Sequence, residues 1–484
     1  MLPVLPKANA CRAVTASSMK VAPASIRSRS TRSGTRTARN ALRPNLRVAT
    51  GAMCAWLPPL LTRFDMHVLR FMPLWLGMAL CLPAWADPSP TLRLSSAIEQ
   101  ALEGSPVLSS ARAALASAQG SELQAGALPN PEIGFEAENL AGSGDYRGTS
   151  AAEYTYSLSQ KIELGGKRAS RRSVAGAERR ATDKDMQAAR LDVIRSVTLA
   201  YGDVLATEEK LKLARAREAL ADEVLANVSQ RVGAARDPLI YKNQADVALA
   251  TARLERQNME RALQLAKRKL ASHWGDAVVT ETLDTTVLTS STLPEPLDVY
   301  QSKLASTPDM QRYDDVRAAK AAAFRLEKTQ SVPDPSFSIG VRDFKESGHQ
   351  AMVAGVSLPL PVLDRNSGNI ARASSEIVQA EQDARQARLN AEQALHEAWL
   401  DWQTAYSEAH ELQTRIIPSA EEALKLSRQG YERGRFSFLE VLNAQRTLAD
   451  AQEQRVNALQ RQLYAKATVQ RLTTPFTSLQ ETTR

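Results

Sequence analysis

The segment GYERGRFSFLEVLNAQ, residues 430–445, decides how the rest of the chain is interpreted. A long helical pattern enters it, breaks around Gly434, and resumes as a second helical pattern with no apolar strand between them. This arrangement predicts the turn of an αα-hairpin. Gly434 supplies the backbone freedom that ends the first helix, and Ser437 followed by Glu440 has the spacing of a capping box.

A second segment, RVGAARDPLIYKNQAD at residues 231–246, has the same design. Leu239 and Asn243 lie two hundred residues before their equivalents in the first segment. Gly233 is the counterpart of Gly434, with turns that differ by one residue in length. The chain is therefore predicted to contain two helical hairpins.

The N-terminal region has the features of an export signal. The net charge of +8 arises there, because residues 1–86 hold 12 Lys and Arg against one acid, and the remainder carries about −3. This distribution removes the argument for nucleic-acid binding. Residues 66–86 have a short basic start, an apolar core and Ala84-Trp85-Ala86, which predicts a signal peptide cleaved after Ala86. Residues 1–65 form a basic leader that we expect not to be translated, with Met66 as the start.

All three cysteines, Cys11, Cys54 and Cys81, precede the predicted cleavage site. The mature chain would therefore have no disulfide or thiolate metal site. Lipidation of Cys81 is the alternative to cleavage after Ala86. After the signal, no apolar run of about 18 residues predicts a transmembrane helix. An exported chain can still cross a membrane as strands.

The order of predicted elements occurs twice, in residues 87–290 and 291–474, before a flexible tail at 475–484. Each copy is predicted to contain two helices, two strands, a long helix and a returning helix. The motif LPNPEIGF before the first strand pair is matched by VPDPSFSIGV before the second. Residues 275–296 form a connector or a small side domain. The fold class is thus mainly α with a small β part, built as a tandem repeat.

The first strand pair has one apolar face and one polar face. Ile133, Phe135 and Ala137 alternate with the acids Glu132, Glu136 and Glu138. On the second strand, Lys161 shares the polar face. These four charged residues would line a barrel interior if the apolar face met lipid; the alternative is a solvated face with no selective role.

The second long helix carries apolar residues at steps of three and four, most of them alanine. The seam runs from Ile370 to Ile416 and predicts a closely approaching partner helix. Pro418 predicts a bend or a restart of this helix.

Four strands cannot close a transmembrane barrel, since the smallest has about eight. Open strand edges cannot face lipid, so several chains would have to share one barrel. Three chains would supply about twelve strands.

The chain resembles the TolC-like outer-membrane efflux channels in three features: the repeated layout, the two turns and the ELGGKR motif at residues 163–168. Within that family, the resemblance is strongest to the branch that serves cobalt-zinc-cadmium efflux. The resemblance implies a homotrimer with a 12-stranded barrel and a periplasmic helical tunnel. It also implies docking to a periplasmic adaptor driven by an inner-membrane RND transporter, in the outer membrane of a Gram-negative bacterium.

The resemblance places the turns at the periplasmic tip, where the pore closes and the adaptor docks. The implied pore-gate residues are Asp237, Glu440, Asn443 and Arg435, and the implied docking residues are Gly233, Leu239, Asn243, Tyr431, Gly434 and Leu439. Related channels often carry two acids one helical turn apart here, whereas this chain has only Glu440 and then Asn443. Glu440 is equally explained as a helix-capping acid.

Other functional classes are less well supported. No nucleophile constellation, phosphate-binding loop or metal-ligand cluster indicates an enzyme or a cofactor. Lys167, Arg168, Arg171 and Arg172 indicate a solvated or headgroup-facing basic cluster. A periplasmic coiled-coil adaptor remains an alternative, and so does a channel for drugs or other organic solutes.

Overall fold

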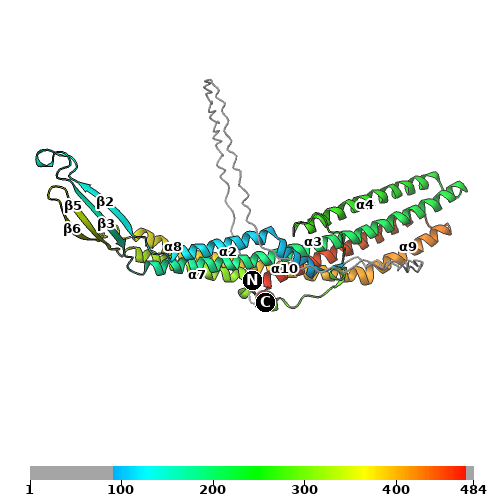
Figure 1. Ribbon diagram of the computed structural model, residues 1–484. Helices are drawn as coiled ribbons and strands as arrows, with labels where there is room; N and C mark the ends of the chain where they lie inside the picture. The colour runs from blue at the N-terminus through cyan, green and yellow to red at the C-terminus, as the bar shows by residue number, and fades with distance from the viewer. Residues whose placement is uncertain (1–90, 476–484) are drawn as a thin grey trace, which may run out of the picture. The chain divides into compact units, whose positions relative to one another are not determined.

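The computed structural model describes residues 91–475 (Figure 1). The predicted leader, the signal peptide with Ala84 and Ala86, and Cys81 lie outside this range. Residues 476–484 of the predicted tail also lie outside it.

The predicted element order is confirmed in both copies. The first copy contains α1 (Leu94–Gly104), α2 (Pro106–Ala125), β2 (Glu132–Glu138), β3 (Glu153–Lys161), α3 (Lys167–Gly233) and α4 (Leu239–Ala271). The second contains α6 (Leu297–Gln301), α7 (Pro308–Gln330), β5 (Ser336–Phe344), β6 (His349–Ser357), α8 (Ser367–Glu411), α9 (Ile417–Glu432) and α10 (Phe438–Thr473). The shorter elements are β1 (Thr91–Leu92), β4 (Thr282–Leu283), α5 (Thr286–Thr289) and the 3-10 turns Gly144–Tyr146 and Leu304–Ser306.

The break predicted at Pro418 takes the form of a π-helical segment. Residues Leu412–Ile416 form this segment between α8 and α9, and Pro418 lies in the first turn of α9. Because proline has no N–H, the carbonyl of Thr414 loses its α-helical donor, and the wider π-helical turn accommodates the gap.

The alanine seam of α8 is buried in part: Ala384, Ala387, Ala391 and Ala394 are half-buried, and Ile416 at its end is exposed. Its buried members are Ala373, Ala380, Ala398, Ala405 and Ala409, and α8 packs against α7 and α10. Small side chains allow these helices to approach closely. The same closeness recurs between α3 and α10, where a Cβ on Gly202 would lie 2.6 Å from a methyl carbon of Leu463.

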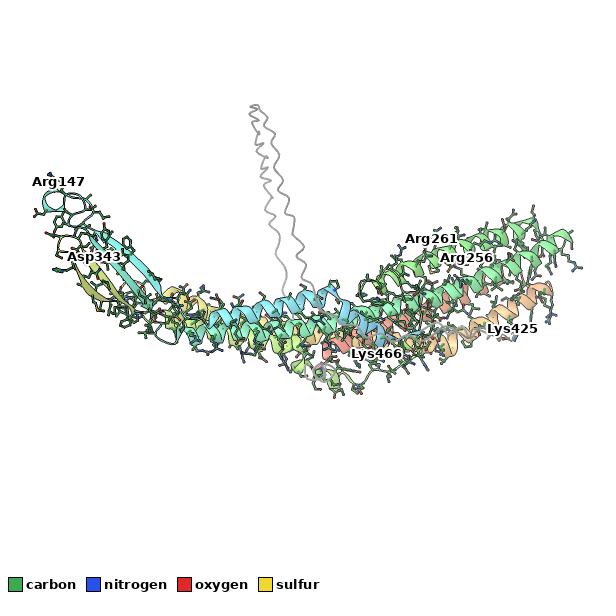
Figure 2. All side chains as sticks on the ribbon, in the orientation of Figure 1. Arg147, Arg256, Arg261, Asp343, Lys425 and Lys466 are labelled. Atoms are coloured by element: carbon green, nitrogen blue, oxygen red, sulfur yellow. The ribbon has the colours of Figure 1, made fainter. Side chains whose placement is uncertain are left out.

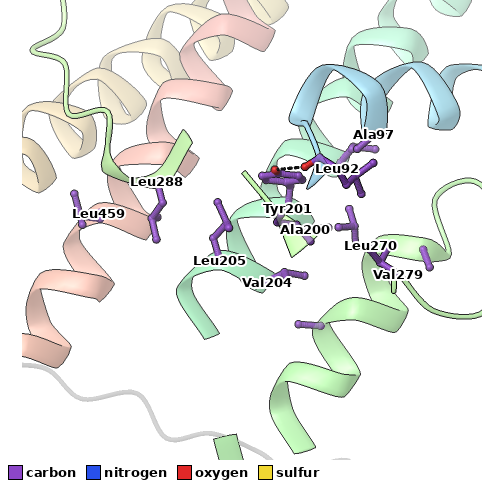
Figure 3. Close-up of a cluster of buried hydrophobic side chains, with 14 of the residues drawn as sticks. Leu92, Ala97, Ala200, Tyr201, Val204, Leu205, Leu270, Val279, Leu288 and Leu459 are labelled. Carbon is purple, nitrogen blue, oxygen red and sulfur yellow. Dashed lines mark hydrogen bonds between the residues drawn. The ribbon is translucent and has the colours of Figure 1, made fainter. Parts of the chain in front are cut away.

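The central core lies where α1, α3, α4 and the connector meet. Tyr201 of α3 is fully buried, and its hydroxyl donates to the Leu92 carbonyl at 2.8 Å (Figure 3). The same hydroxyl accepts from the Asp284 N–H at 2.8 Å. Val279 and Leu288 of the connector pack into this cluster. The segment at 275–296 is therefore a connector tied to the core rather than a side domain.

The four long strands form one antiparallel sheet in the order β2-β3-β5-β6, beyond the ends of α2, α3, α7 and α8 (Figure 1). Its register places Ile133, Leu158, Ile339 and Ala354 in one row across the sheet. The next row holds Phe135, Tyr156, Val341 and Met352 on the same face. This apolar face is exposed, with Ile133 88% and Met352 77% accessible. A single chain leaves the sheet open, with β2 and β6 as its edges.

Candidate functional site

The two helical hairpins end in turns of equal length at the ends of the helices far from the sheet. Residues 234–238 join α3 to α4, and residues 433–437 join α9 to α10. The predicted difference of one residue is therefore wrong. Gly434 has a φ of +68°, as its predicted role requires, but in the first turn the left-handed residue is Ala235 (φ +58°) and not Gly233.

The predicted capping box at the second turn is confirmed. The backbone N–H of Ser437 donates to Glu440 Oε2 at 2.6 Å. Glu440 therefore acts as a cap of α10, and its side chain is exposed at the tip. Asn443 is exposed one helical turn further along, and Arg435 is exposed in the turn itself.

A charged link joins the two hairpins at this tip. Arg231 of α3 forms a two-pronged ion pair with Asp237, with Nε to Oδ2 at 2.8 Å and Nη2 to Oδ1 at 3.3 Å. The hydroxyl of Tyr431, from α9, donates to the same carboxylate. The guanidinium carbon of Arg231 lies 4.6 Å from the centroid of the Tyr431 ring. We call Arg231, Asp237 and Tyr431 the hairpin link.

The hairpin link is shielded from water. The Asp237 side chain is only 7% exposed. Its hydrogen bond with Arg231 holds the pKa of Asp237 below its ordinary 3.8, and the hydrogen bond from Tyr431 lowers it further. Burial raises the pKa of Tyr431, as does the hydrogen bond to Asp237, so the phenol remains a donor at neutral pH.

An apolar cluster and an exposed rim accompany the link. Tyr431 and Phe438 are buried with Val228 and Val441 between the hairpins. The implied docking residues Leu239 and Leu439 are exposed instead, on opposite turns. Gly233, Asn243 and Gly434 are exposed as well. The structure thus separates Asp237 and Tyr431, which hold the hairpins together, from the accessible residues of the tip.

Arg231 is a member of this site that the sequence motifs did not identify. The available signal was the pair of opposite charges that flank the first turn, Arg231 in the last turn of α3 and Asp237 just before α4. That signal predicts an ion pair across the turn. It does not predict that Tyr431, about two hundred residues away, joins it.

The candidate lumen residues share the polar face of the sheet, but some of them form ion pairs. Arg342 of β5 pairs with Glu138 at 3.0 Å and with Glu153 at 2.9 Å. Lys161 lies 3.6 Å from Asp334 rather than standing alone. Glu132 and Glu136 have no ion-pair or hydrogen-bond partner among residues 91–475 and carry the acidic character of this face.

The predicted basic cluster after β3 divides into different environments. Lys167 is buried and pairs with Asp334 at 2.6 Å, and it also donates to the Val332 carbonyl at 2.6 Å. Arg171 forms a two-pronged pair with Glu163, one contact at 2.9 Å. The prediction of one solvated cluster is therefore wrong for these two residues. Lys167 joins the first repeat to the second. Arg171 stays within the first repeat, where it braces the junction between strand and helix.

The described residues contain neither a metal-binding cluster nor a helix able to span a membrane. Between Thr91 and Pro475, no three His, Cys, Asp or Glu side chains lie close enough together to hold a metal ion. In the same part of the chain, each helix is too short or too polar to cross a membrane.

Comparisons with known proteins agree with the fold. A family model described as Outer membrane efflux protein matches residues 97–276 and 299–474. The cobalt-zinc-cadmium resistance protein CzcC of Cupriavidus metallidurans is 29% identical over 423 residues, which cover 83% of this chain and 98% of CzcC. The nickel and cobalt resistance protein CnrC of the same bacterium is 27% identical over 334 residues, 67% of this chain and 76% of CnrC. The solved structure of CusC matches with a TM-score of 0.69 at 18% identity, over 80% of this chain and 94% of that chain.

The family model covers most of both repeats. This match confirms the predicted resemblance and excludes the alternative of a periplasmic adaptor. It also confirms that the chain is not an enzyme. The chain belongs to the outer membrane efflux protein family, and it is an efflux channel in the outer membrane of a Gram-negative bacterium.

Proposed function

We propose that three copies of this chain form a passive conduit for heavy-metal cations, as the outer-membrane component of a tripartite RND-type system. The observation that carries this proposal is the open sheet, with one exposed apolar face and two free edges. A free edge exposes unpaired N–H and C=O groups, which cannot face lipid. Pairing β6 of one copy with β2 of the next removes every free edge, and three copies then contribute about twelve strands.

The internal repeat supports a specific register for that pairing. Glu132 lies opposite Ser159 within the first hairpin, as Ser336 lies opposite Ser357 within the second. Ser159 of β3 is also opposite Ser338 of β5. If β6 of one copy pairs with β2 of the next copy in the same way as β3 pairs with β5, Ser357 of β6 lies opposite Gly134 of β2.

Cysteine cross-linking tests the register. The chain has no cysteine after Cys81, so Ser357→Cys with Gly134→Cys introduces a defined pair. This position corresponds to a pair without mutual backbone hydrogen bonds, where the Cα atoms are close enough for a disulfide. We expect a covalent trimer on non-reducing gels. The control pairs Ser357→Cys with Ile133→Cys, which faces the other side of the sheet; equal cross-linking of both pairs would reject the register.

The tip is proposed as the gate and docking surface of this conduit. The hairpin link would keep the two hairpins of each chain together and the pore narrow. Glu440, Asn443 and Arg435 are accessible to line the narrow end, where Glu440 would give a ring of three carboxylates. The exposed apolar residues Leu239 and Leu439 would contact the periplasmic adaptor.

The cargo assignment rests on the relatives. CzcC and CnrC are described as resistance proteins for cobalt, zinc and cadmium and for nickel and cobalt. Deleting the chain from its host should lower the tolerated concentrations of cobalt, zinc, cadmium or nickel, and the intact gene should restore them. Organic toxicants are tested in parallel. Sensitivity to those compounds alone would replace the metal assignment with organic-solute efflux.

A further inference from the structure

A groove rich in arginine lies between α2 and α3, close to the sheet. It has a volume of about 590 Å³, and Arg168, Arg172 and Arg179 of α3 face a single acid, Glu122 of α2, across it. Leu123 also lines it. The tip, the lumen and the hairpin link use none of these residues.

In the part of the chain that the structure describes, two of the three arginines have no acidic partner and retain N–H donors that could bind an anion. Arg179 is neutralised by Glu122, with Nε to Oε2 at 2.7 Å. Arg168 donates one hydrogen bond, from Nε to the Gly126 carbonyl at 2.6 Å, which leaves its charge uncompensated. Arg172 has no hydrogen-bond or ion-pair partner among residues 91–475. An arginine carries five N–H donors, so Arg168 and Arg172 together offer several to an anion.

Gly126, which follows the last residue of α2, shapes the groove. A Cβ on Gly126 would lie 3.1 Å from Arg172 Cδ and 3.4 Å from its Nε. The arginine side chain therefore lies directly over the glycine backbone, beside Arg168. Both arginines therefore contact the same residue, Gly126, at one side of the groove.

In the proposed barrel, the groove would lie at the depth of a lipid headgroup, because it closely follows the end of a strand. Arg168 is the second residue of α3, and Arg172 is one helical turn, about 6 Å, further along. The preceding strand β3 ends at Lys161. Beside the groove, Leu123 is 82% and Leu128 65% exposed, so apolar and cationic side chains adjoin here. Such a combination suits a phospholipid, whose phosphate and acyl chains lie next to each other.

Backbone hydrogen bonds determine on which side of β3 the strand β2 lies. The Ile162 N–H donates to the Pro335 carbonyl at 2.9 Å, and the Lys345 N–H donates to the Ala152 carbonyl at 3.0 Å. Because these bonds recur at every second residue, the β3 residues whose side chains form the apolar face are the ones whose backbone groups bond to β5. For L-residues, β2 then lies to the right of β3 when the apolar face points to the viewer and the hairpin tips point up. Helix α2, which precedes β2, packs against α3, which follows β3. We infer that Arg172, which lies against the end of α2, is on the side of the apolar face.

We propose that this groove binds the phosphate of an anionic phospholipid in the periplasmic leaflet of the outer membrane. The inference rests on the proposed barrel, in which the apolar face meets lipid. The second repeat does not reproduce the groove: Gly368 and Gln379 stand at the places of Arg168 and Arg179. Arg372, the counterpart of Arg172, is paired with Glu376 and Glu327. Each trimer therefore has three such sites and not six.

Native mass spectrometry of the full-chain trimer tests the site. The protein is titrated with palmitoyl-oleoyl phosphatidylglycerol (POPG), and with the ethanolamine lipid (POPE) for comparison. We expect POPG to bind in preference to POPE, and Arg172→Gln to weaken POPG binding about fivefold, the effect of one cation near a lipid surface. Arg172→Lys should retain most of the binding. The matched control is Arg261→Gln on α4, an exposed arginine far from the sheet (Figure 2).

Three outcomes would overturn the inference: equal POPG binding by wild type and Arg172→Gln, no preference for POPG over POPE, or displacement of bound POPG by millimolar inorganic phosphate. Cross-linking through Ser357 and Gly134 is measured on the same variants. Loss of the covalent trimer would contradict the proposed assembly, whereas an intact trimer with unchanged POPG binding contradicts only the groove.

Discussion

Asp237→Asn is the substitution that most directly tests the hairpin link. Asparagine keeps the size of aspartate and can still accept from the Tyr431 hydroxyl. It removes the negative charge that Arg231 contacts at 2.8 and 3.3 Å. Because Arg231 stays beside the Tyr431 ring, the change leaves a cation without its carboxylate between the two hairpins.

The magnitude follows from the geometry. Hydrogen bonds to charged groups contribute about 1.5–3 kcal/mol, and the Asp237 side chain is 7% exposed, so solvent offers little replacement. Arg231 is 24% exposed and recovers part of its hydration. A loss of about 2 kcal/mol per chain is therefore reasonable, which corresponds to about a 30-fold shift from linked to separated hairpins.

Single-channel recording in planar bilayers measures this shift. Asp237→Asn should increase the open time or the conductance of the purified trimer. The control is Asp246→Asn, the same change at an exposed position of α4 without an ion-pair partner in residues 91–475. Heat-dependent gel mobility verifies that both variants assemble. Currents of Asp237→Asn that match wild type and Asp246→Asn would refute the gating role of the link.

The pKa of Asp237 adds a condition to the same experiment. Its value is lower in the folded chain than the ordinary 3.8, so the link contributes its full stability above about pH 4 and loses it as pH falls through the lower, folded value. Wild-type channels should consequently stay in their neutral-pH state at pH 5. Opening between pH 7 and pH 5 would show that another group controls the tip.

Three further variants test other parts of the molecule. Lys167→Met leaves the carboxylate of Asp334, 7% exposed, without its main cation, and should destabilise the trimer by about 3–5 kcal/mol in thermal unfolding; unchanged melting would contradict a structural role for the pair. Glu440→Gln should cost about 0.5–1 kcal/mol of helix capping and weaken block by cobalt hexaammine; unaltered block would leave Glu440 as a cap alone. Replacing Glu132 and Glu136 together by glutamine should reduce cation preference, measured as the reversal potential in a salt gradient, and a constant potential would exclude an acidic lumen.

Several features of this protein were predictable from local sequence because their causes are local. The 3.6-residue and two-residue apolar periods indicated the long helices and the two-faced strands, and Ser437 with Glu440 indicated the start of α10. The matching turns and Pro-containing motifs revealed the repeat. A period depends only on how side chains project from a regular backbone, so it can be read without knowing the neighbours.

At the junction between strands and helices, the partners of the charged side chains could not be predicted from local sequence. Lys167, Arg168, Arg171 and Arg172 look alike in sequence. In the fold, Lys167 meets Asp334 and Arg171 meets Glu163, while Arg168 and Arg172 turn toward α2. Sequence could not separate them, because their partners come from other turns of the chain or from the other repeat.

The tip was likewise only half predictable. Its turn chemistry was visible in the sequence at Gly434, yet the left-handed residue of the first turn proved to be Ala235. Asp237 was predicted at the tip, but its union with Arg231 and Tyr431 was not. Sequence alone determined the elements and their repetition, and tertiary structure decided which charges meet. Backbone periods arise from nearest neighbours, whereas ion pairs depend on how distant helices and strands pack side by side.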